Sequence, residues 1–232
     1  TVSDGQGGFD TATVTVNVAA LPSPVYETSG EMVFDGSNAN VIELDPLPIY
    51  DFAEGTISFE FNASSLGKDR GLFARDASGL AGNGNHIAIY VDQSTLKARL
   101  QDGVNTTFLT FGGIAAGASY DVALVFAASG SELYVNGALV DSDAITTSWA
   151  GSPEFLQFGS LGWASNSGQS GFRSSNNFRG TISDQKIFSE ALNSDQIAEL
   201  HTDGPVNLDP IAVDDTATTN EAVVVTINAV AN

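Results

Sequence analysis

The stretch SELYVNGALVDS, residues 131–142, holds two short alternating runs on either side of Asn136-Gly137. A two-residue hairpin turn of type I′ needs positive φ at both central residues, and Asn-Gly adopts it readily. Leu133 and Val135 would then share one face of the first strand. The stretch therefore predicts a tight β-hairpin with one buried face.

The same alternation recurs along the chain before this hairpin. Three further runs place apolar side chains at every second position: Ile57, Phe59 and Phe61; Ile87, Ile89 and Val91; and Val122, Leu124 and Phe126. Clusters of Gly, Asn and Asp separate the runs, which is typical of turns between strands. The pattern predicts an all-β sandwich of two packed sheets.

One helix is predicted after these strands. Asn193 is a good N-cap residue, and Gln196 three positions later can bond back to it in a capping box. Ile197 and Leu200 give the segment an apolar face, and Asp195 in the first turn suits the helix dipole.

The composition excludes several classes of function. The 232 residues include no cysteine, and 28 Asp and Glu against 8 Lys and Arg give a net charge of -20. Disulfides and thiol chemistry are therefore absent, and nucleic acid and anionic membranes are poor partners because phosphate binding needs a basic surface. No apolar run reaches the length of a membrane span. The carboxylates either keep an extracellular protein soluble, or bind Ca²⁺, or do both.

Proline-containing linkers divide the chain into zones. The predicted organisation is a terminal strand in residues 1–20, a linker at 21–29, the sandwich domain over 30–202, a linker at 203–210 and a further strand segment over 211–232. Residues 10–18 and 223–227 are the predicted strands of the two ends. A lone strand cannot satisfy its backbone, so these ends must pair with each other or remain partly disordered.

Four motifs of the middle zone, in this order, resemble the laminin-G-like domains of the concanavalin A-like lectin superfamily. These motifs are Phe34-Asp35-Gly36, Leu133 to Gly137, Phe178 to Phe188, and Ala191-Leu192-Asn193 before the helix. The resemblance implies a jelly-roll β-sandwich that binds ligands and rarely catalyses. Many members carry an aspartate where this chain has Ser183; Asp184 follows it and would face the opposite side of a regular strand.

The two ends of the chain resemble parts of bacterial cadherin-like, or immunoglobulin-like, adhesin repeats. Residues 3–16 resemble the last strand of one repeat, and residues 212–219 resemble the opening of the next. The resemblance implies calcium-binding aspartates at the junctions, for which Asp4, Asp214 and Asp215 are the candidates; exposed turn carboxylates are the alternative. It also implies a location on the bacterial cell surface or in the secreted fraction, with neighbouring repeats of the same polypeptide as partners.

Catalytic motifs are not apparent in the sequence. Retaining glycosidases of the sandwich architecture carry two glutamates and an aspartate on one strand, but no Glu-x-Asp-x-x-Glu string occurs here. Glu54 and Glu60 lie six residues apart, and the two histidines, His86 and His201, are more typical of structural positions. We therefore expect a binding protein rather than an enzyme.

The longest predicted loop, residues 162–177, is the candidate ligand site. Loops of this length are usually functional or disordered. Trp163 could stack on a sugar ring, and Arg173, Asn176 and Asn177 could bond to its hydroxyls. The alternative is that Trp163 packs at the base of the hairpin and the remaining residues of the loop have no ligand-binding role.

A calcium site is predicted in the glycine-rich segment that precedes residue 86. Asp76, Asn83 and Asn85 offer the oxygen ligands that Ca²⁺ prefers, although the same residues are common in turns. Asp35 and Asp184 are further candidate ligands, and Asp35 could instead cap its own turn. The sequence thus predicts a calcium-stabilised, glycan-binding adhesion module of a large surface protein. The alternative is a non-catalytic spacer or protein-binding module.

Overall fold

The computed structural model describes residues 2–3, 9–10, 21–37, 39–75, 85–152, 154–161 and 176–202. Contacts between Cα atoms divide the chain into two units, residues 1–20 with 205–232 and residues 21–204. In the first unit, β1 (Val2–Ser3) pairs antiparallel with β2 (Phe9–Asp10), on either side of the predicted glycine-rich turn. The remainder of the predicted terminal strands lies outside the described residues.

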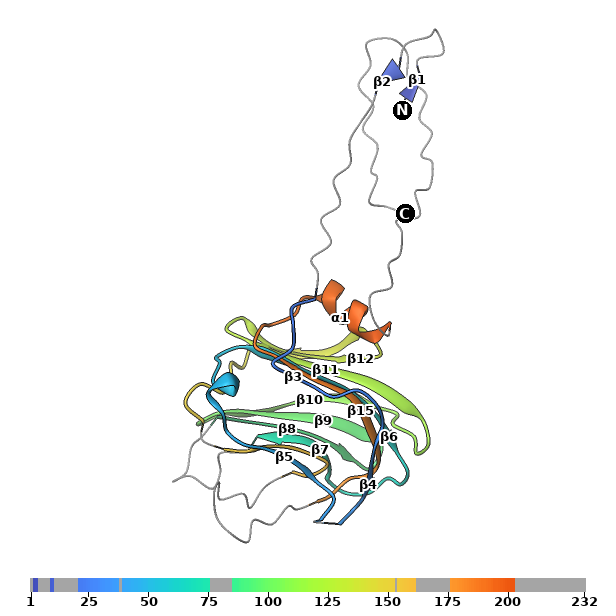
Figure 1. Cartoon of the computed structure of the whole chain (residues 1–232), viewed down its shortest axis with the longest axis vertical. Coiled ribbons are helices and arrows are strands. Elements are labelled where there is room, and N and C mark those ends of the chain that lie inside the picture. The colour runs from blue at the N-terminus through green and yellow to red at the C-terminus, as the bar shows by residue number, and fades with distance from the viewer. Residues whose placement is uncertain are drawn as a thin grey trace. The chain divides into compact units, whose positions relative to one another are not determined.

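The second unit consists of two facing sheets (Figure 1). Sheet I contains β3 (Tyr26–Glu27), β4 (Met32–Asp35), β6 (Gly55–Ala63), β11 (Ser119–Ala127), β12 (Gly130–Val135), β13 (Ala138–Asp143) and β15 (Arg179–Phe188). Sheet II contains β5 (Ile42–Leu44), β7 (Arg70–Arg75), β8 (Asn85–Asp92), β9 (Thr95–Asp102), β10 (Thr106–Gly112) and β14 (Leu156–Phe158). The short 3-10 helix η1 (Pro48–Tyr50) follows β5.

Both sheets are antiparallel and non-sequential in strand order. Sheet I runs β13-β12-β11-β6-β15-β3, with β4 also paired to β15, and sheet II runs β10-β9-β8-β7-β14-β5. This arrangement is the jelly-roll-like sandwich that the sequence predicts. Strands far apart in the chain, such as β6 and β15, therefore lie side by side.

The core between the sheets confirms the predicted alternation. The apolar positions predicted for β6, β8, β11 and β12 are all buried. Phe59 of sheet I meets Phe158 of sheet II edge to face, with ring centroids 6.1 Å apart. Burial of each such side chain stabilises the fold by about 1.5 to 3 kcal/mol, so the layer between the sheets is the main source of stability.

The Asn-Gly hairpin and the helix cap are also confirmed. Asn136 and Gly137 have φ of 51° and 75°, the positive values that a type I′ turn requires. The helix α1 (Ser194–His201) begins with the predicted capping box, because the Asn193 side chain accepts from the Gln196 backbone and the Gln196 side chain accepts from Asn193. Local signals therefore determine both elements.

The predicted orientation of Asp184 is wrong. A β-bulge interrupts the pairing of β15 with β6 between Ser183 and Lys186, and Asp184 has φ of 51°. A bulge adds a residue to one strand and so changes the side that the following residues face. Asp184 consequently lies with Lys186 on the outer surface of sheet I, beside Glu60.

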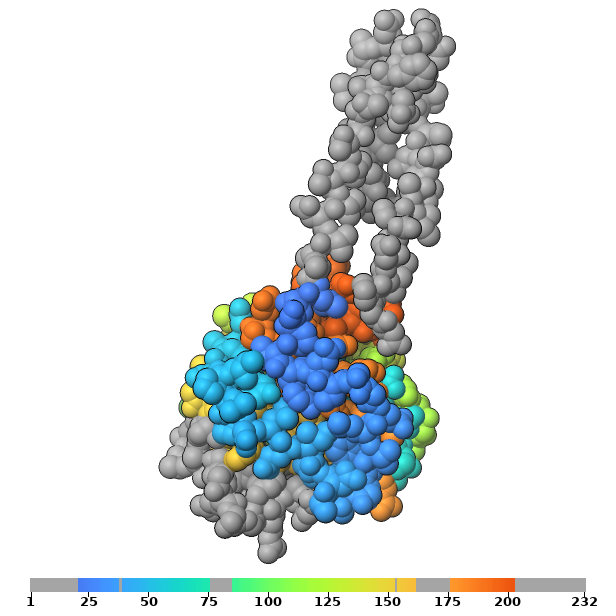
Figure 2. All heavy atoms as spheres, viewed as in Figure 1, coloured from blue at the N-terminus to red at the C-terminus, as the bar shows by residue number. Residues whose placement is uncertain are grey.

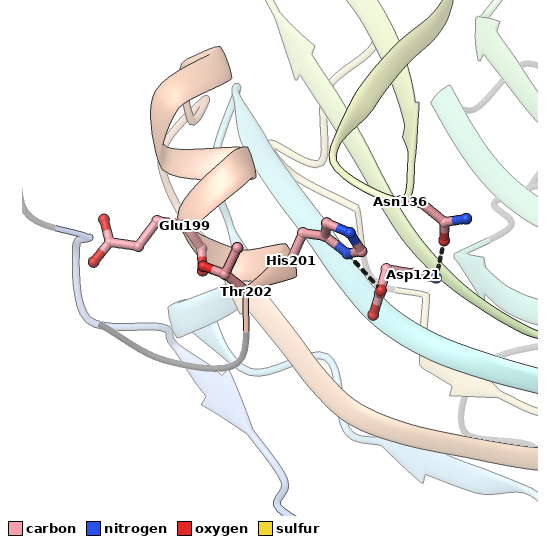
Figure 3. Close-up of polar contacts among 5 residues, drawn as sticks. All are labelled: Asp121, Asn136, Glu199, His201 and Thr202. Atoms are coloured by element: carbon pink, nitrogen blue, oxygen red, sulfur yellow. Dashed lines mark hydrogen bonds and ion pairs between the residues drawn. The ribbon is translucent and has the colours of Figure 1, made fainter. Parts of the chain in front are cut away.

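The helix covers part of the outer face of sheet I. Ile197 of α1 joins an apolar cluster that includes Tyr134 and Phe188, and Leu200 packs against it. At the last residue of α1, the His201 Nδ1 lies 2.6 Å from the Asp121 Oδ2 (Figure 3). Within the described part of the chain, no helix is long and apolar enough to cross a membrane.

Candidate functional site

The outer face of sheet II presents cationic and aromatic side chains in adjacent positions. Strand register places Arg99 of β9 opposite Phe108 of β10, and Lys97 opposite Tyr90 of β8. Opposed residues on antiparallel strands point to the same face with Cβ atoms about 5 Å apart. Phe108 is 47% exposed. An open aromatic ring thus lies beside a guanidinium group.

Charged groups of both signs lie near the Tyr90 side chain, which is itself buried, with 6% of its surface exposed. Burial raises the pKa of Tyr90; nearby Lys97 and Arg99 act to lower it, and Asp69 and Asp92 act to raise it. The Lys97 ammonium donates to the Asp92 carboxylate over 2.7 Å, and this bond raises the pKa of Lys97. We call these five residues the Tyr90 cluster. The charged groups of the cluster, rather than the buried Tyr90 ring, are the ones that can bond to the hydroxyls of a sugar.

Small residues in the middle of the same face make room for a crossing segment. A Cβ atom at Gly71 would lie 2.3 Å from the Ser160 carbonyl carbon and 2.4 Å from the Leu161 nitrogen, so the chain crosses β7 directly against it. Leu161 is fully buried and packs with Ala74 and Tyr90. Leu161 therefore anchors the beginning of the predicted ligand loop on this face.

The other end of that loop returns to the same place. The Gly71 N–H donates to the Asn176 carbonyl over 2.8 Å, and Gly71 is also the cross-strand partner of Tyr90. Asn176 is exposed with φ of 53°, whereas Asn177 is buried with its Nδ2 3.5 Å from the Gly36 carbonyl. The structure thus brings the two predicted asparagines next to the Tyr90 cluster. Trp163 and Arg173 lie outside the described residues.

The predicted calcium ligands fall in several places. Asp76, Asn83, Asp4, Asp214 and Asp215 are outside the described residues. The other three lie apart, because Asp35 ends β4, Asn85 begins β8 in the opposite sheet, and Asp184 is on the bulge of β15.

The described candidates do not form a metal centre among themselves. The Asp35 carboxylate accepts the Ser37 N–H over 2.8 Å, so it caps its own turn, and hydrogen bonds from Ser37 lower its pKa. In the described ranges, no group of three or more His, Asp or Glu is arranged to hold a metal ion.

The Tyr90 cluster and Phe108 were not among the sequence-predicted site residues. A signal for them exists in the sequence, because five of the eight Lys and Arg residues lie between positions 68 and 99 in an otherwise acidic chain. Lys97 and Arg99 also occupy alternate positions of one strand, which places them on one face. Which aromatic residues adjoin them depends on strand register, which the sequence pattern does not reveal.

Comparison with protein families matches the sandwich. Residues 35–198 match the Laminin_G_3 family, described as the concanavalin A-like lectin/glucanases superfamily. The chain belongs to this family. A comparison with curated proteins gives no match.

Solved structures of similar fold include sugar-binding modules. A Ruminococcus gnavus IT-sialidase CBM40 bound to α2,3-sialyllactose has a TM-score of 0.62 at 16% identity, covering 77% of this chain and 100% of that one. A pentraxin from Limulus polyphemus has a TM-score of 0.57 at 18% identity, and the match covers 75% of this chain and 83% of that one. A leech intramolecular trans-sialidase has a TM-score of 0.58 at 19% identity, and the match covers 78% of this chain but 28% of that one. At these identities the likeness shows the fold alone.

Proposed function

We propose that residues 21–204 form an extracellular carbohydrate-binding module whose binding face is the outer face of sheet II. The observation that carries the proposal is the juxtaposition of the Tyr90 cluster, the exposed Phe108 ring and both ends of segment 162–175. Aromatic rings bind the apolar face of a sugar, and the neighbouring charged groups bind its hydroxyls. The sialyllactose in the CBM40 structure supports this class of ligand.

The attachment of the sandwich favours a binding module over a spacer. Leu21, where this unit begins, packs against the same apolar cluster as Leu200 near the end of α1. Figure 2 shows the surface of the first residues after position 21 (blue) beside that of the α1 region (orange). A domain lengthens an array only when the chain enters and leaves at opposite ends. Among the described residues, both Leu21 and the end of α1 are on the side of sheet I, whereas the candidate site is on the outer face of sheet II.

The biological setting is part of the proposal. We place the module in a large bacterial surface or secreted adhesin, with extracellular glycans as partners and neighbouring repeats on either side. The sequence resemblance of the two ends supports this setting. We also propose that calcium stabilises the module, which the excess of carboxylates and the sequence positions of Asp76 and Asn83 support.

A glycan array probed with the whole chain, with and without a chelator, tests these statements. We expect binding to a subset of glycans, with sialyllactose among the probes. Phe108→Ser and Arg99→Gln should each weaken the binding about tenfold or more. The matched control is Leu139→Ser, a half-exposed apolar residue of sheet I, which should bind as the natural chain does.

Each outcome of the array decides one part of the proposal. Binding to no glycan under either condition would overturn carbohydrate recognition and favour a protein ligand. Binding that survives the chelator, together with an unchanged melting temperature, would remove calcium from the proposal. Equal losses in Leu139→Ser and Phe108→Ser would move the site away from sheet II.

A further inference from the structure

One end of the sandwich, separate from the face of sheet II, has a hollow among its described residues. There β6 begins at Gly55, β11 ends at Ala127, β8 begins at Asn85 and β9 ends at Asp102. This surface hollow has a volume of about 520 Å³. Ligand pockets in proteins have volumes of about 300 to 1,000 Å³, so the cavity has room for a small ligand. We call it the end pocket.

The end pocket lies over the layer between the sheets. Asn85 and Asp102 oppose each other in the last pair of the β8–β9 ladder. Because side chains alternate along a strand, these two side chains point inward, as those of the core residues Ile87 and Leu100 do. The Tyr90 cluster has the outward direction. The two sites are therefore distinct.

Internal hydrogen bonds fix the walls of the end pocket. The buried Thr147 donates its hydroxyl to the Gln101 carbonyl over 2.8 Å. The Asp102 carboxylate accepts from the backbone and side chain of Asn105, over 2.8 and 3.1 Å, and these bonds lower its pKa. A preformed pocket loses little conformational freedom when a ligand binds.

Three polar side chains of the lining remain available to a ligand. Glu54, Asn85 and Thr146 line the cavity, and none of the three side chains has a hydrogen-bond partner in the structure as described. Together they offer a carboxylate acceptor, an amide donor and acceptor, and a hydroxyl. Neighbouring hydroxyls of a sugar ring need this combination of donors and acceptors.

The remaining lining restricts the ligand further. Three alanines, Ala53, Ala127 and Ala128, leave space for a ring to approach the wall. The carboxylates of Glu54 and Asp102 disfavour an anion because like charges repel. The described lining has no lysine or arginine to offset them. The ligand that fits is uncharged and rich in hydroxyls.

We propose that the end pocket is a second carbohydrate subsite, which takes one neutral sugar residue. It does not depend on the function proposed for sheet II, since it shares no residue with that face. With Glu54, Asn85 and Thr146 as polar contacts and no aromatic ring in the described lining, binding of a single sugar is weak. An extended glycan that reaches both sites would bind more tightly through its two contacts.

The test is an NMR titration of the whole chain with three neutral methyl glycosides, those of galactose, mannose and N-acetylglucosamine. We expect at least one of them to shift the backbone amides of residues 53–54, 85 and 146–148. Ala53→Trp fills the pocket from an exposed position and should abolish these shifts. Ala116→Trp is the matched control, because it adds the same ring at an exposed turn before β11, at the other end of that strand.

A second pair of variants avoids dependence on the bulky substitution. Glu54→Gln removes a charged acceptor and should weaken binding about tenfold, and Glu54→Asp should retain part of it. Absence of shifts at the pocket residues with all three glycosides would overturn the proposal, as would equal shifts in Ala53→Trp. The same spectra report on β8 to β10, so failure of the end pocket is distinguished from failure of the sheet II face.

Discussion

The two outer faces of the sandwich differ in what covers them. The face of sheet I carries α1, the beginning of the unit at Leu21, and a surface hollow lined by Glu60, Asp121 and Asp184. The face of sheet II carries Lys97 and Arg99 with their aromatic neighbours. One pattern of alternating strands thus produces an attachment face and a candidate recognition face.

This division has a physical consequence for mutations. Substitutions on sheet I should change stability through α1 without changing ligand binding, because the cluster around Ile197 is confined to that face. Substitutions at the outward positions of sheet II that form the candidate site should change ligand binding, with stability affected only where they disturb the underlying packing. A variant that breaks this rule would show that the two faces are coupled through the core.

The largest expected effect is the loss of a buried cation that supports sheet II from inside. Arg75 donates to the carbonyls of Tyr50 and Ser152, each over 2.7 Å, and lies 5.1 Å from the Trp149 ring centre. Arg75→Ala leaves both carbonyls without this donor, and each unsatisfied buried group costs about 1 to 3 kcal/mol, so the free energy of unfolding should fall by about 2 to 5 kcal/mol. Urea denaturation measures the change.

An exposed arginine on the other sheet provides the control for Arg75. Arg179→Ala removes a guanidinium at the surface of β15, where Nε donates to the Asp35 carbonyl over 3.2 Å, and should change stability by about 0.5 kcal/mol or less. If Arg75→Ala were as mild as this control, other donors would have to replace the buried guanidinium.

A smaller effect is expected where the chain crosses sheet II. Gly71→Ala places a methyl group within 2.4 Å of the Leu161 nitrogen, so the crossing segment must move. Overpacking of this kind lowers stability by about 1 to 3 kcal/mol. If the outer face of sheet II binds glycans as proposed, glycan affinity should also fall, because Leu161 packs against Tyr90 of that face. Thermal melting and titration with the best array ligand measure the two changes.

A second glycine of the same sheet provides the control for Gly71→Ala. Gly112→Ala adds the same methyl group where nothing lies within 4 Å, at a negative or extended φ. It should leave both stability and affinity close to those of the natural chain. Loss of affinity in both glycine variants would mean that sheet II tolerates no change, rather than that the crossing matters.

Much of the fold can be predicted from the sequence because its signals are local. Asn136-Gly137 sets its own turn, Asn193 and Gln196 satisfy each other within one helical turn, and the alternation of β6 and β8 identifies their buried faces. Each of these inferences needs only neighbouring residues. The structure confirms all of them.

The candidate site depends on pairings between distant strands, and here the sequence is less informative. Arg75 ends a strand as a charged residue, yet its guanidinium reaches the interior, because carbonyls from two other segments meet it there. Glu60 and Asp121 become direct neighbours only through the register of β6 and β11. The β-bulge at Asp184 changes the side of the sheet that this residue faces, so strict alternation along β15 assigns that side incorrectly.

On sheet I, loss of the N-cap of α1 should lower the free energy of unfolding by about 1 kcal/mol. The Asn193 side chain accepts from the backbone N–H groups of Asp195 and Gln196, each over 3.0 Å. Asn193→Ala removes both bonds and should lower stability by about 0.5 to 2 kcal/mol. Glycan affinity should not change, since the cap lies on the attachment face. Reduced affinity would contradict the separation of the two faces.

The smallest expected effect concerns the pair that fixes the end of α1. His201 and Asp121 are each about one-third exposed, with 37% of each side chain accessible, so their attraction is screened by water and salt. Asp121→Asn also removes the repulsion between Asp121 and Glu60, its cross-strand partner, and the two effects oppose each other. A double-mutant cycle with His201→Gln separates them and should give a coupling below about 1 kcal/mol that shrinks in high salt. A coupling that is large and independent of salt would mean that His201 holds the helix by packing against Gly137, where a Cβ would lie 3.0 Å from its ring, rather than by charge.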